Sequence, residues 1–91
     1  MSHHYIWDEA KRRSNLAKHS LDFSQARRIA WDYAILIQLQ TVDGEERELV
    51  YAALEDRIVV VVYTMRGDAM RLISLRYATG RERITYYENT R

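Results

Sequence analysis

Apolar and polar positions alternate most clearly in the second half of the chain. Residues 58–63 are an unbroken run of β-branched and aromatic side chains, which predicts a strand covered on both faces. Gly67 follows, and because glycine takes a positive φ without steric cost, the chain is expected to turn back there. In the returning strand, residues 69–77, regular alternation would place Arg71 on one face and Arg76 on the other. We therefore predict a central hairpin whose second strand carries one arginine on each face.

Two further strands are predicted before this hairpin. Residues 35–40 have the alternation of a half-buried strand, and residues 47–54 are expected to form its partner. Between them, Asp43-Gly44 is the strongest hairpin signal in the chain. The apolar residues 5–7 fit either a short strand or a packed lead-in to a helix.

Two helices are predicted near the N-terminus. Asp8 can cap a helix over residues 9–19. Its apolar stripe would be formed by Trp7, Ala10, Ser14, Ala17 and Leu21. Asp22 and Gln25 have capping-box spacing and open a second helix, residues 22–31. This second helix is expected to bury Phe23, Ala26, Ile29, Ala30 and Tyr33.

A third helix is predicted at the C-terminus. Thr79 and Glu82 have the spacing of another capping box, and they would open a helix of about ten residues. Ile84 and Tyr87 are expected to face inward, with Tyr86 nearby.

The order of these elements predicts an α+β fold. It would consist of two N-terminal helices, a four-stranded antiparallel β-meander and one C-terminal helix, because strands that follow each other tend to pair. The two N-terminal helices are expected to cover one face of the sheet. The 91 residues leave room for one hydrophobic core, so residues 1–91 should form a single domain.

Composition narrows the class of protein. With 47% hydrophobic and 30% charged residues, the chain is typical of soluble globular proteins. It has no cysteine, which excludes disulfide frameworks and thiolate metal sites. No apolar run approaches the roughly 20 residues of a membrane span, and the N-terminus lacks a signal-peptide core. A cytoplasmic location without membrane contact is expected.

Charge is distributed unevenly along the chain. Residues 1–30 and 58–91 each carry a net charge of +3, whereas residues 31–57 carry −5. Arginine supplies twelve of the fourteen cations, which suits bidentate contact with phosphate or carboxylate. The segments could form a basic patch, or simply a mixed solvated surface.

Several separated motifs resemble the BrnT family of bacterial toxins. In the first half these are Trp7-Asp8-Glu9-Ala10-Lys11, Asn15, Lys18-His19, Asp22-Phe23 and Ala26. In the second half they are Glu46-Arg47, residues 59–64, Arg66-Gly67, residues 71–74, Arg76, Ala78 and Glu82-Arg83. The resemblance covers nearly the whole chain, with residues 31–43 matching least. Ser20 departs from the glycine usual in the family, and Leu75 from the alanine.

The resemblance implies a ribonuclease toxin of a type II toxin–antitoxin pair, with a RelE-like fold. Such a toxin would cleave RNA without a metal or other cofactor and arrest growth by blocking translation. A BrnA-type antitoxin would neutralise it in a 2:2 heterotetramer, and operator DNA would be bound only through that antitoxin. Ser20 would have to accept the backbone of the glycine, and Leu75 adds bulk beside Arg76, so either departure could weaken activity.

Metal-independent RNA cleavage needs activation of the 2′-hydroxyl, stabilisation of charge on the phosphate, and protonation of the leaving oxygen. His19 could act as base or acid because the ordinary pKa of histidine lies near neutrality, or it could stabilise the end of its helix. Lys18 could bind phosphate or remain solvated. The acidic residues 43–56 show no recognisable ligand spacing, so no metal site is expected.

Arg71 and Arg76 are the strongest candidates for stabilising the pentacovalent phosphate. Set among apolar side chains, each guanidinium would be held against the sheet and could donate two parallel hydrogen bonds. The alternative is a structural ion pair, for example with Glu82 or Glu48.

Three further side chains are candidates for RNA contacts. Arg66, near the turn, is expected to contact phosphate as part of the catalytic group, and Arg83 could join the same basic surface. Tyr63 offers a stacking face for a base, although burial in the core is the commoner fate of tyrosine.

A catalytically inactive binding module is the competing interpretation. In it, the same basic residues would serve an antitoxin or nucleic acid without cleavage. The sequence holds no Ser/His/Asp triad, no phosphate-cradling glycine loop and no paired carboxylates at a recognisable spacing. The residues alone leave both interpretations open, and the family resemblance favours the enzyme.

Overall fold

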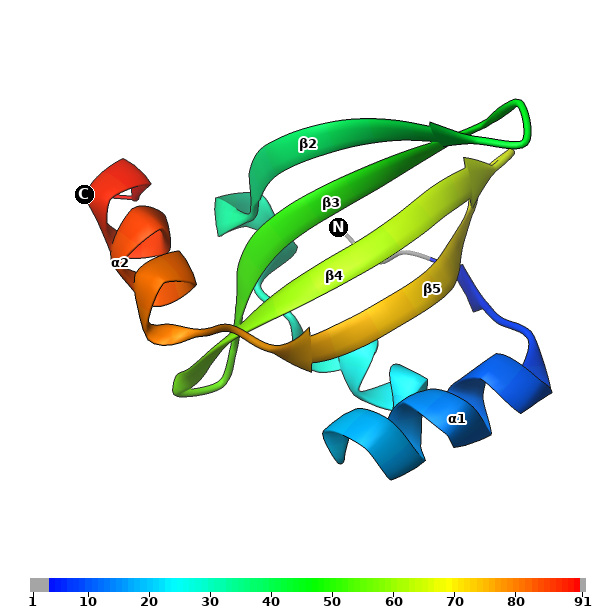
Figure 1. The fold of residues 1–91 in the computed structure, drawn as a ribbon, viewed down its shortest axis with the longest axis horizontal. Helices are drawn as coiled ribbons and strands as arrows, with labels where there is room; N and C mark the ends of the chain where they lie inside the picture. The colour runs from blue at the N-terminus through cyan, green and yellow to red at the C-terminus, as the bar shows by residue number, and fades with distance from the viewer. Residues whose placement is uncertain (1–3, 91) are drawn as a thin grey trace.

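The computed structural model describes residues 4–90, and within them five strands form one mixed sheet in the order β1-β5-β4-β3-β2 (Figure 1). The elements are β1 (His4–Ile6), α1 (Glu9–His19), the 3-10 helices η1 (Phe23–Arg28) and η2 (Trp31–Tyr33), β2 (Ile35–Val42), β3 (Glu45–Leu54), β4 (Arg57–Arg66), β5 (Ala69–Tyr77) and α2 (Gly80–Asn89). No helix in the described part of the chain is long and apolar enough to cross a membrane.

The predicted four-stranded antiparallel meander is wrong, because β1 adds a fifth strand that runs parallel to β5. The antiparallel pairs β2–β3, β3–β4 and β4–β5 are as predicted. Tyr5 pairs with Met70 and Ile6 with Arg71, so β1 satisfies backbone groups along the first three residues of the β5 edge. A strand of three residues gives too short a pattern to be told from a packed lead-in.

Both predicted hairpin turns are confirmed. Asp43 and Gly44 have φ angles of 51° and 78°, the two positive values that the tightest hairpin turn requires. Gly67 has φ of 60° in the turn between β4 and β5. The residues that follow Arg57 in β4 are buried from Ile58 to Val61, as expected for a strand covered on both faces.

A β-bulge in β5 changes which side chains share a face. Val62 pairs with Ser74 and Tyr63 with Leu72, so Ile73 is an extra residue with no partner across the strand. The alternation therefore shifts by one after Leu72. Arg71 and Arg76 consequently lie on the same face of the sheet, and the prediction of one arginine on each face is wrong.

The larger core lies on the other face, which we call the core face. Leu72 and Leu75 of β5 pack there with Val59 and Val61 of β4, under Leu21 and the side chains of η1. Phe23, Ala26 and Ile29 are buried as predicted, whereas Ala30 and Tyr33 are exposed.

The helix predicted over residues 22–31 is instead two 3-10 segments. The capping box of Asp22 and Gln25 is confirmed. The helix then stops because Ile29 forms a β-bridge with Leu54 and the Ala30 N–H donates to the Ala53 carbonyl. Pairing with the end of β3 requires extended backbone, which overrides the helical pattern of this segment.

The helix α1 lies beside β5 rather than over the sheet (Figure 1). Asp8 caps it as predicted. The predicted apolar stripe is wrong for Ala10, Ser14 and Ala17, which are exposed, whereas Leu21 is buried and Trp7 packs against the core as predicted. The buried residue of α1 is Asn15, whose side chain forms hydrogen bonds with the backbone of β5 at the edge of the sheet.

The opposite face of the sheet, the α2 face, is covered only at one end. There α2 begins at the predicted capping box of Thr79 and Glu82 and packs on Ile58 and Val60. Figure 1 shows this helix at one end of the sheet. Tyr86 points inward, while Ile84 and Tyr87 are 61% and 53% exposed, so the predicted inner face of this helix is reversed. Most of the α2 face beyond the helix stays open.

Candidate nucleic-acid interface

Four arginines lie on the α2 face, Arg76 beside the first turn of α2 and the others beyond the helix, and we call this surface the basic face. They are Arg47 of β3, Arg66 of β4, and Arg71 and Arg76 of β5. Arg76 pairs across the strands with Val60, which lies under α2, and Arg71 pairs with Thr64 farther along the same face. Arg47 and Arg66 both contact Glu45, which places them on one side of the sheet.

Arg76 is engaged in an ion pair. Its two terminal nitrogens donate to the two Glu82 carboxylate oxygens at 2.8 and 2.9 Å. The Tyr51 hydroxyl and the Thr79 N–H also donate to this carboxylate, at 3.5 and 2.8 Å. The hydrogen bonds from Arg76, more than any other contact, lower the pKa of Glu82 to about 2 although burial opposes the shift. The pair ties β5 to the first turn of α2, which is the structural alternative considered for Arg76.

Arg66 shares a carboxylate with Arg47. An Arg66 terminal nitrogen lies 2.7 Å from Glu45, and the Arg47 Nε lies 3.4 Å from the same group. These contacts, with the Arg66 hydrogen bond as the largest cause, lower the pKa of Glu45. The Arg66 side chain remains 54% exposed, so it can still meet a ligand from solvent.

Arg71 differs from its neighbours. Its side chain is half-buried, and among residues 4–90 its guanidinium takes part in no hydrogen bond or ion pair. A guanidinium presents five donors in a planar fork. Arg71 therefore differs from the other three arginines of the basic face in having no carboxylate partner among the described residues.

A polar pocket of about 220 Å³ lies between α1 and the β5 bulge, and we call it the edge pocket. Its lining residues are Lys11, Ser14, Asn15, Lys18, His19, Ile73 and Ser74. Three of these side chains are basic, and no carboxylate lines the pocket. An anion such as an RNA phosphate would find cations and hydroxyl groups here, without a like charge to repel it.

Asn15 holds the two sides of this pocket together. Its Oδ1 accepts from the Leu75 N–H at 3.0 Å, and its Nδ2 donates to the Leu75 carbonyl at 2.8 Å. A third hydrogen bond, 3.0 Å long, joins Nδ2 to the Leu21 carbonyl. The amide thus pairs with β5 as a neighbouring strand would, beyond the point where β1 ends, and fixes α1 against the sheet.

The bulge brings the edge pocket and the basic face together. Ser74 lines the pocket, and it lies between Arg71 and Arg76 along the same strand. His19 and Lys18, predicted as site residues, are in the pocket, while the predicted arginines are on the adjoining face. Sequence reasoning missed Lys11, Ser14, Ser74 and Arg47. A regular alternation gave no sign of the bulge beside Ser74, and the docking of α1 against β5 depends on contacts between distant segments.

Two predicted RNA-binding residues lie elsewhere. Arg83 is on α2, where its guanidinium donates to the Ala78 carbonyl at 3.4 Å. Tyr63 lies on the core face, with its ring edge-on to Trp31 at a centroid distance of 5.8 Å. Burial, together with the charge of the neighbouring Glu48, raises the pKa of Tyr63 to about 12. The sheet separates Tyr63 from the four arginines.

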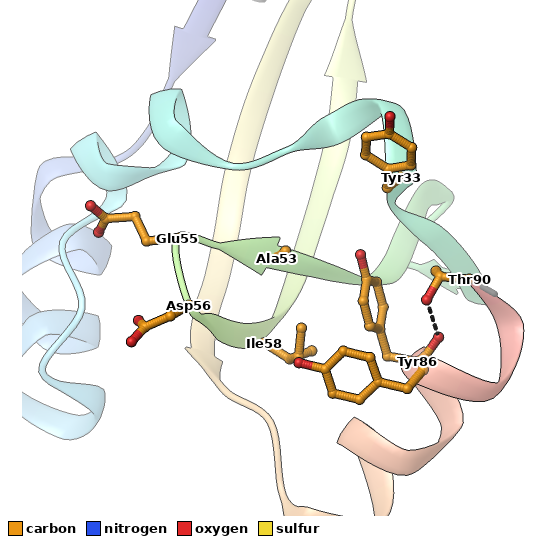
Figure 2. Close-up of a pocket in the computed structure, with 8 residues that line it drawn as sticks. Tyr33, Ala53, Glu55, Asp56, Ile58, Tyr86 and Thr90 are labelled. Atoms are coloured by element: carbon orange, nitrogen blue, oxygen red, sulfur yellow. Dashed lines mark hydrogen bonds between the residues drawn. The ribbon is translucent and has the colours of Figure 1, made fainter.

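A larger hollow, of about 350 Å³, lies between α2 and the turn from β3 to β4 (Figure 2). Ala53, Ile58 and Tyr86 line it, and Figure 2 shows the carboxylates of Glu55 and Asp56 directed away from the tyrosine. No cation lines this hollow, so it is poorly suited to a phosphate. Among residues 4–90, no group of three or more His, Asp or Glu side chains could together hold a metal ion.

Comparison with known proteins assigns the chain to a family. Residues 7–82 match the family described as the ribonuclease toxin BrnT of type II toxin–antitoxin systems. No curated protein matches the chain. The matched segment runs from Trp7, just before α1, to Glu82 in the first turn of α2, so it includes the edge pocket and the whole basic face. This chain therefore belongs to the BrnT family, the ribonuclease toxins of type II toxin–antitoxin systems.

Proposed function

We propose that this toxin is a metal-independent endoribonuclease whose active site lies where the edge pocket meets the basic face. The observation that supports this location best is the β5 bulge. It places Arg71 and Arg76 on one face and brings Ser74, between them, into a pocket with His19 and Lys18. The strand β5 then adjoins the groups that RNA cleavage needs. These are an acid–base side chain (His19), a guanidinium without an ion-pair partner (Arg71) and a cation for the phosphate (Lys18).

Each residue has a role in the proposed reaction. His19 removes the proton from the 2′-hydroxyl or donates one to the leaving 5′-oxygen, and a water molecule makes the other proton transfer. The 2′-oxygen attacks the phosphorus, the bond to the 5′-oxygen breaks, and Arg71 stabilises the negative charge on the pentacovalent phosphate. Lys18 and Lys11 bind that phosphate or the next one. The ion pair with Glu82 makes Arg76 a positioning residue at the rim of the site.

The remaining cations extend the RNA path. Arg66 and Arg47 would bind flanking phosphates, because phosphate contacts position a nucleic acid without reading its sequence. Arg83, on α2, would contact RNA only if the RNA strand continued past Arg76. Tyr63 is left out of this path, since its ring packs against Trp31 on the opposite face.

The consequences in the cell follow the family. The chain has an antitoxin partner by its membership in a type II system. We propose that this partner is of the BrnA type, forms a 2:2 heterotetramer with the toxin, and alone contacts operator DNA. Cleavage of cytoplasmic RNA would then block translation and arrest growth whenever antitoxin is lacking.

The test is RNA cleavage by the purified toxin in the presence of a chelator. Arg71→Ala and His19→Ala should each lower the cleavage rate by about 100-fold or more, because each removes a group that acts in the transition state. Arg28→Ala is the matched control. Arg28 is an exposed arginine of η1 and lies with that segment over the core face. Equal cleavage rates for the wild type and all three variants would contradict the proposed location of the active site.

A binding-only function is favoured by one observation. Both Arg66 and Arg76 are held by carboxylates, so much of the basic face is already neutralised within the chain. This alternative predicts that expression without antitoxin leaves growth and RNA integrity unchanged, while the antitoxin still binds. RNA degradation that depends on Arg71 would exclude it.

A further inference from the structure

A second uncovered surface lies on the core face, beyond η1 and η2. The sheet there forms a hollow of about 300 Å³, which we call the apolar hollow. It is lined chiefly by Trp31, Leu36, Glu48, Val50, Tyr63 and Met65. Leu36 and Met65 are 54% and 44% exposed, and Leu39, which pairs with Glu48 across the strands, is 57% exposed. Apolar side chains gathered in this way on an open surface mark an interaction site.

The hollow continues onto the free edge of the sheet. β2 is the outermost strand, and within residues 4–90 it pairs only with β3. Its eight residues contain no charged side chain and no proline, two of the devices that usually protect an edge strand. A register shift between Leu36 and Gln38 interrupts the strand near one end, and residues 38–42 pair regularly beyond it. Ile37 and Val42 are also exposed, by 40% and 38%. Such an edge is suited to pairing with an extended segment of another chain.

The negative charge in and beside the apolar hollow limits the kind of molecule that can bind there. Glu48 lies in the hollow, Glu46 follows on the same face of β3, and no lysine or arginine lines the hollow. Tyr63 lies beside Glu48, and burial together with this carboxylate raises the pKa of its hydroxyl group. Phosphates of RNA or of an anionic lipid surface would be repelled. A second copy of this chain, docked about a two-fold axis, would bring like carboxylates together.

A protein segment with both apolar and basic side chains meets each of these conditions. We propose that the apolar hollow and the β2 edge anchor the antitoxin through such a segment. The antitoxin is the protein partner that membership in the family supplies. This anchor lies across the sheet from the basic face. The anchor depends on the proposed antitoxin partner and not on the proposed RNA-cleaving site. Either of these two proposals can therefore be wrong while the other is right.

The test is the affinity of the purified toxin for its cognate antitoxin, measured by titration calorimetry. Leu39→Lys and Glu48→Lys should each weaken binding by about 30-fold or more, the loss typical of a central interface residue. Ile84→Lys is the matched control, since Ile84 is similarly exposed on α2. That substitution should change the affinity by no more than about threefold. Cleavage of RNA by the free toxin should be the same in all three variants and the wild type.

Three results would contradict the proposal that the antitoxin binds at the apolar hollow and the β2 edge. The first is an antitoxin affinity that stays within about threefold for both Leu39→Lys and Glu48→Lys. The second is a toxin dimer in light scattering that Leu39→Lys dissociates, because the hollow would then serve a second copy. The third is a loss of RNA binding on Leu39→Lys in the absence of antitoxin. Leu39→Ala repeats the test without an added charge, should Leu39→Lys fail to fold.

Discussion

Arg71 and Arg76 lie on one strand and one face, yet their guanidinium groups have different surroundings. Arg76 forms a two-pronged ion pair with Glu82, whereas the fork of Arg71 has no acceptor among residues 4–90. A guanidinium with free donors can contact a phosphate without first breaking a bond within the protein. At the scale of single residues, this difference is the reason we propose Arg71 for charge stabilisation and Arg76 for support.

The ion pair of Arg76 predicts a dependence of stability on pH. The folded-state pKa of Glu82 is about 2, below its ordinary value of 4.5. Its contribution is therefore fully present above about pH 4.5 and is lost as the pH falls towards 2. We expect a loss on the order of 2 kcal/mol in the free energy of unfolding, allowing for solvent screening at a site that is partly open. Urea unfolding at a series of pH values measures it.

Two variants separate this ion pair from other acidic groups. Glu82→Gln should flatten the acid limb of the stability profile between pH 4.5 and 2. Arg76→Ala should lower stability at neutral pH, because it leaves the Glu82 carboxylate without its main partner. An acid limb that is the same in Glu82→Gln and wild type would show that the pair contributes nothing.

Ser20 carries a local strain that the sequence anticipated. It caps α1 with φ of 60° and ψ of 24°, the left-handed conformation that glycine adopts most readily. Ser20→Gly should raise the free energy of unfolding by about 1 kcal/mol. In the left-handed conformation the Cβ atom of a residue lies too close to the carbonyl oxygen that follows it, and glycine has no Cβ. Thermal unfolding measures the gain. A lower melting temperature for Ser20→Gly would contradict this account of the cap.

At the scale of elements, local signals were predictable from the sequence and long-range pairings were not. The hairpin turn at Asp43-Gly44, the capping boxes and the buried run of β4 follow from neighbouring residues, and all are confirmed. The parallel strand β1, the end of η1 and the β5 bulge depend on contacts with distant segments. A three-residue strand has little pattern of its own, and a bulge leaves the composition of its strand unchanged. The bulge alone moved Arg71 and Arg76 onto one face.

The edge pocket shows the same limit. His19 and Lys18 were predicted as site residues from their chemistry, but Ser74 was assigned to a regular strand. Asn15, which joins α1 to β5, stood out only as a position shared with the family. A single asparagine carries no sign in the sequence of the backbone groups that it will meet across 60 positions of the chain.

Asn15 therefore gives a prediction for the docking of α1. Asn15→Ala removes three hydrogen bonds and leaves the buried N–H and carbonyl of Leu75 unpaired. We expect a loss on the order of 2–4 kcal/mol in the free energy of unfolding. Because α1 carries His19, cleavage should also fall where the protein is still folded. Denaturant titration and cleavage below the unfolding midpoint measure the two effects, and Ser14→Ala on the exposed surface of α1 is the control.

At the scale of the whole molecule, one half of the sheet is left open on both faces, and the two faces differ in charge. The α2 face presents four arginines, while the core face beyond η2 presents apolar side chains with Glu46 and Glu48. The chain has a net charge of only +1, so its overall balance conceals this division. A nucleic acid and a basic protein segment can then bind opposite sides of one sheet. The family match identifies the class of toxin. From the difference in charge between the two faces, we propose that the basic face binds RNA and that the core face binds the antitoxin.

The most direct test is the chemistry of the cut, measured with purified toxin in excess chelator. The substrates are one RNA oligonucleotide that the toxin cleaves and the same oligonucleotide with a single 2′-deoxy sugar at the cleaved position. If the 2′-oxygen attacks the phosphate, the first substrate yields 2′,3′-cyclic phosphate and 5′-hydroxyl ends, and the second stays intact. Arg71→Lys, which keeps the charge but loses the planar fork, should slow the first reaction by about 100-fold or more. Cleavage that requires an added divalent cation, or that proceeds equally on the deoxy substrate, would contradict the proposed mechanism.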